Sequence, residues 1–247
     1  MIETAVEILT SDGAADGFLI QPEKAGRWPG VVYLTYIVGI DDASRRMASR
    51  LAAEGYAVLL PNIFYRNGAP PIFNFPFEIG DERFVKRTNE IRSVLTPDAM
   101  DRDLSAYVEF LARQPGVQGK RFGVVGFGFS ARMVLRAAAA RPDQVGAAAA
   151  FDGGGLYTDA PDSPHMLLSR VKADLCFGYG AEDRSIPREV IEKLNRALAE
   201  WGGNYESDVY QAQHGWTVPG SPTYDQPEAE RAYQKLTAFL NSTLKHT

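Results

Sequence analysis

One short stretch, in which an apolar strand runs through a tight glycine turn directly into an alanine-rich helix, constrains this chain most. The stretch is "VVGFGFSARMVLRAAAA", residues 124–140. A strand, a sharp Gly-x-Gly-x-Ser turn and a helix in this order are typical of a nucleophile elbow, whose central residue stands exposed at the edge of a sheet. The central residue here is Gly128, which has no side chain to attack with. The turn predicts an α/β fold and leaves the chemistry open.

The rest of the chain repeats strand and helix patterns. Residues 4–22, "TAVEILTSDGAADGFLIQP", alternate apolar and polar residues on both sides of a Ser-Asp-Gly turn, which predicts an opening β-hairpin. Continuous apolar runs, typical of parallel strands covered on both faces, then alternate with helical patterns. We expect strands at 30–36, 56–62, 121–126, 145–151, 174–179 and 205–210, and helices at about 42–54, 97–113, 129–141, 187–201 and 226–243. The pattern predicts one α/β domain over 1–247, with a mostly parallel open sheet, an N-terminal hairpin and helices on both faces.

Residues 62–95 interrupt this rhythm. The segment is rich in proline and aromatic residues and has neither a helical nor a strand period. We expect an irregular insertion there, which in a compact domain often serves as a lid or binding loop. Its aromatic side chains could equally form a small core of their own.

Composition and charge exclude several classes of function. The net charge is −5 with no run of Lys or Arg, so nucleic acid is not an expected partner. The chain lacks a basic leader and an apolar run of 18 residues, which favours a cytoplasmic protein and excludes a membrane partner. With Cys176 alone and three histidines (His165, His214 and His246), we expect no disulfide, no zinc or iron site and no cofactor. The expected partner is a small molecule, and the expected assembly a monomer or weak homo-oligomer.

Three candidate residues follow predicted strands in the order nucleophile position, acid and histidine, which is the order expected of an α/β-hydrolase. Gly128 comes first, Asp183 follows in "FGYGAEDRSIP", and His214 lies in "YQAQHGW". In an open parallel sheet, ligands bind beyond the carboxyl ends of the strands. An aspartate held there could orient a histidine and stabilise its imidazolium. The alternatives are that Asp183 is a turn residue capping a helix and that His214 is a surface loop residue.

The chain resembles the dienelactone hydrolase family of α/β-hydrolases over nearly its whole length. The matching segments are "PGVVYLTYIVGI", "RLAAEGYAVLLPNIF", "VVGFGFSARMVLRAA", "GAEDRSIP" and "HGW". The resemblance implies an α/β-hydrolase fold and a hydrolase of small esters or lactones. It makes Asp183 and His214 the acid and base, and the backbone N–H groups of Phe129 and Ile37 the oxyanion hole.

The chain also departs from the family pattern at three places. The elbow cysteine is replaced by Gly128, and a His-Glu pair of the oxyanion loop by Thr35 and Tyr36. The arginine that holds the substrate carboxylate in dienelactone hydrolases is replaced by Val218. The resemblance therefore implies a site without its nucleophile, and it argues against dienelactones that bear a carboxylate.

Other side chains could contribute to the site. Ser130 could replace the nucleophile, but we expect its hydroxyl to bond backbone, and a shifted elbow would put Arg132 where a small residue is needed. Cys176 lies within a buried strand, where free cysteines are usually inert. Asp152 ends an apolar strand and is either a solvated turn residue or a pocket acid beside His214. The residues expected to line the pocket or bind substrate are Tyr36, Tyr65, Arg66, Asp152 and Trp216.

Four hypotheses remain open from the sequence. The first is a hydrolase in which Gly128 leaves room for an attacking water, so that activity is weak, water-based or lost. The second is a non-hydrolytic protein that binds a small ligand. The third is a lyase, isomerase or cyclase in which His214 moves a proton. In the fourth, the glycine was introduced to disarm an enzyme.

Overall fold

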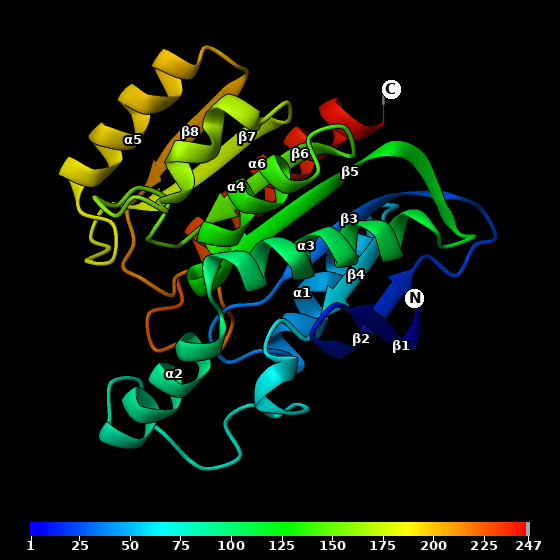
Figure 1. Cartoon of the computed structure of the whole chain (residues 1–247), viewed down its shortest axis with the longest axis horizontal. Coiled ribbons are helices and arrows are strands. Elements are labelled where there is room, and N and C mark those ends of the chain that lie inside the picture. The colour runs from blue at the N-terminus through cyan, green and yellow to red at the C-terminus, as the bar shows by residue number, and fades with distance from the viewer. Residues whose placement is uncertain (246–247) are drawn as a thin grey trace.

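The computed structural model describes residues 1–245, which are built around one eight-stranded sheet (Figure 1). The strand order is β1-β2-β4-β3-β5-β6-β7-β8. The strands are β1 (Ile2–Thr10), β2 (Gly13–Gln21), β3 (Trp28–Leu34), β4 (Ala57–Pro61), β5 (Val117–Phe127), β6 (Val145–Phe151), β7 (Asp174–Gly180) and β8 (Tyr205–Tyr210).

Strand direction divides the sheet into two parts. The hairpin strands β1 and β2 pair antiparallel, and β2 joins β4 antiparallel. The six strands from β4 to β8 in the sheet order all run parallel. The predicted α/β fold, a mostly parallel sheet with an N-terminal hairpin, is confirmed.

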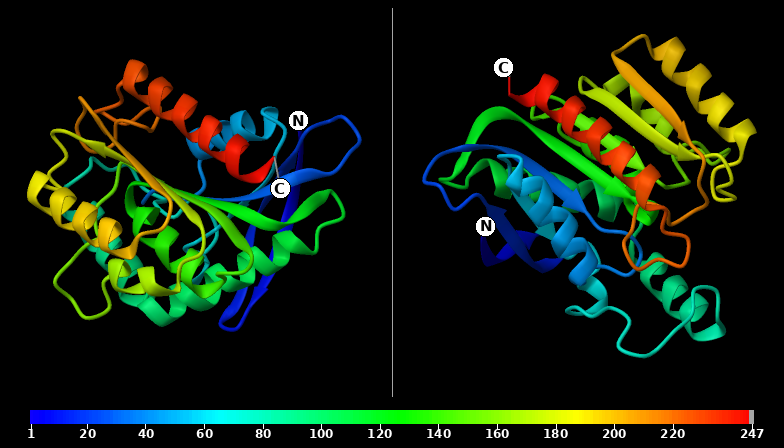
Figure 2. Two further views of the ribbon diagram at one scale, coloured as in Figure 1. Left: turned by 90° about the horizontal axis from the view of Figure 1, so that it is seen from above. Right: turned by 180° about the vertical axis from the view of Figure 1, so that it is seen from behind.

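Helices cover both faces of the sheet. Helices α1 (Asp42–Ala53) and α6 (Gln226–Leu244) lie on one face, and α3 (Pro97–Ala112), α4 (Ala131–Ala140) and α5 (Arg188–Trp201) lie on the other (Figure 2). Neighbouring residues of one strand consequently enter two separate hydrophobic clusters: Val32 packs with α3 and α4, whereas Val31 packs with α1 and α6. Because both faces are buried, each buried Val, Leu, Ile or Phe side chain of the strands gains about 1.5–3 kcal/mol from burial. The parallel strands therefore read as continuous apolar runs.

The insertion is more regular than its sequence predicts. The expectation of irregular chain over 62–95 is wrong for 82–94, which form α2 (Glu82–Val94). Asp81 caps this helix, since its carboxylate accepts a hydrogen bond from the N–H of Phe84 at 2.6 Å. The aromatic rings of Phe73 and Phe77 pack on that of Phe84, with centroids 5.1 and 5.3 Å away. Phe73, Phe77 and Phe84 therefore form an aromatic cluster within the insertion. This cluster is not separate, since Phe73 and Phe84 belong to the main hydrophobic core.

Strand β5 and one helical segment also differ from the sequence prediction. Strand β5 begins at Val117, earlier than residue 121, because Val117 pairs with Trp28 at the start of β3. A short 3₁₀ helix, η3 (Pro164–Arg170), occupies a segment for which no element was expected. Among residues 1–245, no helix is both long and apolar enough to cross a membrane.

Candidate active site

The register of the central strands brings the candidate residues to one edge of the sheet. Phe127, the last residue of β5, pairs with Phe151, the last of β6, and Phe151 pairs with Gly178 of β7. Gly128 and Asp152 therefore leave the sheet side by side. A Cβ atom placed on Gly128 would lie 3.8 Å from the carbonyl oxygen of Asp152.

The backbone at Gly128 has the geometry of an elbow that carries a side chain. Its φ is +53°, in the left-handed region, and it opens the turn η2 (Gly128–Ser130), which leads into α4. The nearest neighbour of an added Cβ would be the Cβ of Tyr36 at 3.5 Å, an ordinary contact distance. At Gly126, by contrast, an added Cβ would lie 2.7 Å from the Ser130 carbonyl oxygen. Gly126 is required for close packing, whereas position 128 has room for a side chain.

Asp183 and His214 meet at this edge, on the loops that follow β7 and β8. The Nδ1 of His214 lies 3.0 Å from Asp183 Oδ2, and Asp183 Oδ1 accepts a hydrogen bond from the N–H of Ser185 at 2.7 Å. Asp183 is buried, while the side chain of His214 is 49% exposed. Within residues 1–245 the Nε2 of His214 has no hydrogen-bond partner, and the ring opens onto a surface pocket of about 410 Å³ lined also by Glu182, Arg184 and Gln213.

The contact shifts both groups toward their charged forms. Burial would raise the pKa of Asp183, but hydrogen bonds from His214 and Ser185 outweigh it and lower that pKa. The bond to Asp183 raises the pKa of His214 above its ordinary value, against burial and with help from Asp152. Asp183 is therefore ionised at neutral pH and bonds the imidazole at Nδ1. This leaves Nε2 available for proton transfer.

Asp152 is a buried carboxylate behind the same histidine. The interpretation of Asp152 as a solvated turn residue is wrong, because the residue is only 1% exposed and has a φ of +58°. Its carboxylate accepts hydrogen bonds from Gly215 N–H at 2.7 Å and from the Thr217 hydroxyl at 3.0 Å, and it lies 3.8 Å from His214 Nδ1. Burial raises the pKa of Asp152 to about 6, although the charge of His214 and these hydrogen bonds oppose the rise. Asp152 thus ties the end of β6 to the loop that carries His214.

Asp152, Asp183 and His214 are also the residues best placed to hold a metal ion. Their potential ligand atoms all lie within 4.8 Å of one another. Each carboxylate oxygen, however, already accepts a hydrogen bond from Ser185, His214, Gly215 or Thr217. The arrangement is a hydrogen-bonded network around a histidine, and we assign it no metal.

Neither alternative nucleophile can reach a ligand. The hydroxyl of Ser130 is fully buried, donates to the Leu34 carbonyl at 3.0 Å and accepts from the Phe127 N–H at 3.0 Å, as its sequence position predicted. The thiol of Cys176 is also fully buried, and burial raises its pKa, so it stays protonated and inert.

The loop after β3 lies against the elbow. Tyr36 presents its Cβ to Gly128, and its hydroxyl donates to Asp41, the N-cap of α1. Burial and this bond raise the pKa of Tyr36, so the phenol remains neutral. Ile37 is partly buried beside it, and Phe129 packs its ring into the core. Phe129 and Ile37 stay predictions as oxyanion donors.

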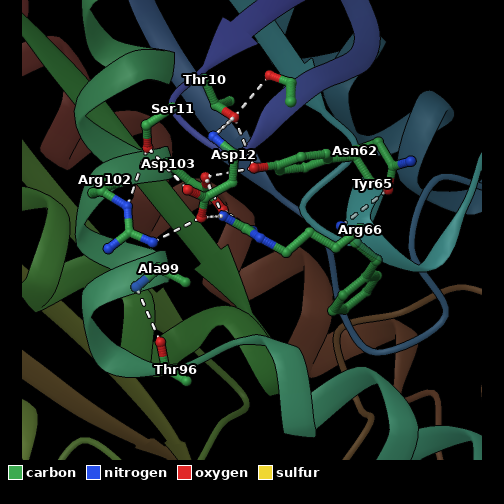
Figure 3. A network of polar contacts seen from close by, with 12 residues as sticks. Thr10, Ser11, Asp12, Asn62, Tyr65, Arg66, Thr96, Ala99, Arg102 and Asp103 are labelled. Atoms are coloured by element: carbon green, nitrogen blue, oxygen red, sulfur yellow. Dashed lines mark hydrogen bonds and ion pairs between the residues drawn. The ribbon is translucent and has the colours of Figure 1, made fainter.

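Tyr65 and Arg66 lie in a different place from the one expected. The hydroxyl of Tyr65 lies 2.7 Å from the Thr10 hydroxyl and donates to Asp103 at 3.0 Å, as Figure 3 shows. The guanidinium of Arg66 pairs with Asp103 and with Asp12, each at 2.5 Å. The expectation that Tyr65 and Arg66 line a substrate pocket is therefore wrong: both side chains join the turn of the hairpin to α3.

Trp216 is likewise a core residue. Its side chain is fully buried among residues of α6 and stacks on Tyr210 with ring centroids 4.5 Å apart. The expectation that Trp216 lines the substrate pocket is wrong, because the chain turns the indole inward two residues after the exposed His214.

Two residues that support the site, Ser185 and Thr217, were not expected from the sequence. Ser185 donates to Asp183 through its N–H, and its hydroxyl lies 3.2 Å from His214 Nδ1. Thr217 binds Asp152 from the far end of the histidine loop. The bond from Ser185 could have been predicted, since an aspartate side chain often accepts a hydrogen bond from the backbone N–H two residues further on. The bond from Thr217 could not have been predicted, because its partner is 65 residues away.

Comparison with known proteins places this geometry in context. The family model described as "Dienelactone hydrolase family" matches residues 15–244. A Synechocystis protein named "Putative carboxymethylenebutenolidase" is 27% identical over 98% of this chain and 97% of its own. The crystal structure of a "Putative Dienelactone Hydrolase" from Klebsiella pneumoniae superposes with a TM-score of 0.85 at 25% identity, covering 96% of this chain and 97% of that one. The metagenomic dienelactone hydrolase-like phosphotriesterase P91 shares the fold with a TM-score of 0.78 at 22% identity, covering 99% of this chain and 100% of its own.

Proposed function

Because the chain belongs to the dienelactone hydrolase family, we propose that it acts on a small ester or lactone at the sheet edge formed by Gly128, Asp183 and His214. The observation that carries the proposal is the 3.0 Å contact between His214 Nδ1 and Asp183 Oδ2. It is made by loops that leave the parallel sheet at the same edge as the side-chain-free elbow. Such a contact orients the imidazole and leaves its second nitrogen available as a base.

Water is the nucleophile that this site can use. With no side chain at 128, a water molecule can stand where the family's cysteine would be. As its oxygen attacks the carbonyl carbon, its proton passes to Nε2 of His214, and Asp183 stabilises the imidazolium. The N–H groups of Phe129 and Ile37 would hold the oxyanion. The tetrahedral intermediate then expels the alcohol oxygen, which takes the proton back from His214.

This route is slow compared with covalent catalysis. A hydrolase without its nucleophile retains about 10³ to 10⁴-fold acceleration from binding and the oxyanion hole. The room around Gly128 supports the same scheme, since the backbone there has the shape of an elbow that can hold a side chain.

The Nε2 of His214, which has no hydrogen-bond partner in the part of the chain that the structure describes, favours a second candidate function. An exposed imidazole whose pKa is raised by Asp183 can take and return a proton without any nucleophile. A lyase, isomerase or cyclase reaction would use it in this way. A protein that only binds a small ligand, the other alternative, would not need the Asp183–His214 contact.

The test compares hydrolysis of p-nitrophenyl acetate and of a small lactone by the wild-type chain, Gly128→Cys, Gly128→Ser and His214→Ala. We expect slow wild-type hydrolysis that His214→Ala abolishes, and at least a 10²-fold increase in Gly128→Cys. Cys176→Ala is the matched control and should change nothing, because its thiol is buried. No hydrolysis by Gly128→Cys, in a folded protein, would overturn the proposal. His214-dependent turnover that releases no carboxylic acid would favour the second candidate.

A further inference from the structure

Arg132, in the first turn of α4, is a half-buried arginine without an acidic partner among residues 1–245. Its Nε is completely buried and makes no hydrogen bond. Arg136, one turn further along the same helix, shows how the fold treats an ordinary buried arginine. It pairs with Asp101 at 3.1 Å and donates to the carbonyl oxygen of Asp162 at 2.6 Å.

Three features make the position of Arg132 costly. A partly buried charge without a partner loses hydration that nothing replaces. The N-terminus of a helix carries a partial positive charge, which repels a cation. Burial, followed by the like charge of Arg92, lowers the pKa of Arg132. All three effects would be relieved by an anion at the guanidinium.

The surroundings direct both arginines to the elbow. The guanidinium carbon of Arg132 lies 5.2 Å from the ring centroid of Phe129, and that of Arg92, from α2, lies 5.9 Å from the same centroid. Phe129 directly follows Gly128. The backbone of Gly155, just past the end of β6, packs against the guanidinium of Arg132, since a Cβ there would lie 3.0 Å from the guanidinium carbon.

We propose that Arg132 and Arg92 form a subsite for an anionic group, a carboxylate or a phosphate, on the molecule that binds at the elbow. A guanidinium presents paired N–H donors that match either group. Cation–π contacts with Phe129 hold the two side chains beside the elbow.

This subsite differs from the one that the family pattern would supply. The position of the family's carboxylate-binding arginine is Val218, which is buried and apolar. Val218 therefore does not exclude anionic ligands, since Arg132 of α4 and Arg92 of α2 supply the positive charge instead. The location beside the reacting atoms rests on the proposed function, whereas anion binding itself does not.

Calorimetric binding separates the subsite from catalysis. The probes are the monoethyl succinate anion, neutral diethyl succinate and inorganic phosphate, each titrated into the wild-type chain, Arg132→Met, Arg132→Lys and Arg92→Gln. We expect Arg132→Met to weaken binding of the monoethyl succinate anion at least tenfold and to leave the affinity for diethyl succinate unchanged. Arg132→Lys should retain part of the affinity, and Arg92→Gln should weaken it several-fold. The relative affinities of phosphate and monoethyl succinate identify the preferred anion.

Matched controls make the outcome decisive. Arg50→Met removes an arginine that already pairs with Glu230 and should leave anion binding unchanged. His214→Ala should also bind the anion normally. Hydrolysis that persists in His214→Ala, with anion binding intact, would overturn the proposed function alone. Arg132→Met should have an unchanged or raised Tm, because it removes an unpaired charge. Equal anion affinity in wild type and Arg132→Met, whatever the Tm of the variant, would overturn the subsite.

Discussion

The carboxylate of Asp152 accepts a hydrogen bond from the backbone N–H of Gly215 at 2.7 Å. This bond connects the end of β6 to the residue directly after His214, and Thr217 adds a second connection to the same carboxylate at 3.0 Å. The position of the proposed base therefore depends on a buried acid that does not belong to the Asp183–His214 pair.

Asp152→Asn should change how stability depends on pH. The pKa of Asp152 is raised from 3.8 to about 6 in the folded chain, so the unfolded chain loses this proton first. Relative to Asp152→Asn, the wild type is then most stable below pH 4. Between pH 4 and 7 it loses up to about 3 kcal/mol of unfolding free energy relative to that variant. Urea denaturation of both proteins at pH 4, 5.5 and 7 measures the difference, and parallel curves would contradict the prediction.

Asp183→Asn should lower the pKa of His214. The carboxylate raises that pKa, so the protonated imidazole contributes stability below pH 6.5 that is lost as the pH rises through the folded-state value. An NMR titration of the imidazole should show a midpoint at lower pH in Asp183→Asn. His165, which stacks on Tyr157, is the internal reference and should keep its midpoint. A midpoint for His214 that does not move would show that Asp183 does not control its charge.

Gly128→Ala should cost stability without a clash. A φ of +53° is left-handed, which costs a residue with a Cβ about 1–2 kcal/mol, while the nearest atom stays 3.5 Å away. Gly126→Ala should cost more, because its Cβ would lie 2.7 Å from a backbone oxygen. Thermal unfolding of the two variants compares these costs. The reverse order of stability would contradict the assignment of 128 as the side-chain position of the elbow.

Arg66→Met should destabilise the fold and leave any hydrolysis unchanged. The substitution leaves Asp103 as a buried carboxylate without its ion pair, which costs about 3–5 kcal/mol. Arg66→Met combined with Asp103→Leu should recover much of that loss, since no buried charge remains. Urea denaturation gives the stabilities, and ester hydrolysis per folded molecule gives the activity. A loss of activity per folded molecule in the double variant would contradict the structural role and show that Arg66 contributes to the substrate pocket.

The sequence by itself determined the class of fold and the edge at which the candidate site lies. Apolar runs with strand and helix periods report local structure, and they predicted the parallel sheet, the hairpin and the strand ends at Gly128, Asp183 and His214. Even the role of Ser130 followed, because its partner Phe127 is three residues away.

Only the tertiary structure decided what surrounds these residues. Nothing local distinguishes a tyrosine that lines a pocket from Tyr65, whose partner Asp103 lies 38 residues along the chain, or an exposed indole from Trp216. The burial of Asp152, and the lack of an acidic partner for Arg132 within the described part of the chain, likewise depend on which segments pack against them. A charged side chain acquires its energy from its neighbours in space, and those neighbours are chosen by the packing of the whole sheet and its helices.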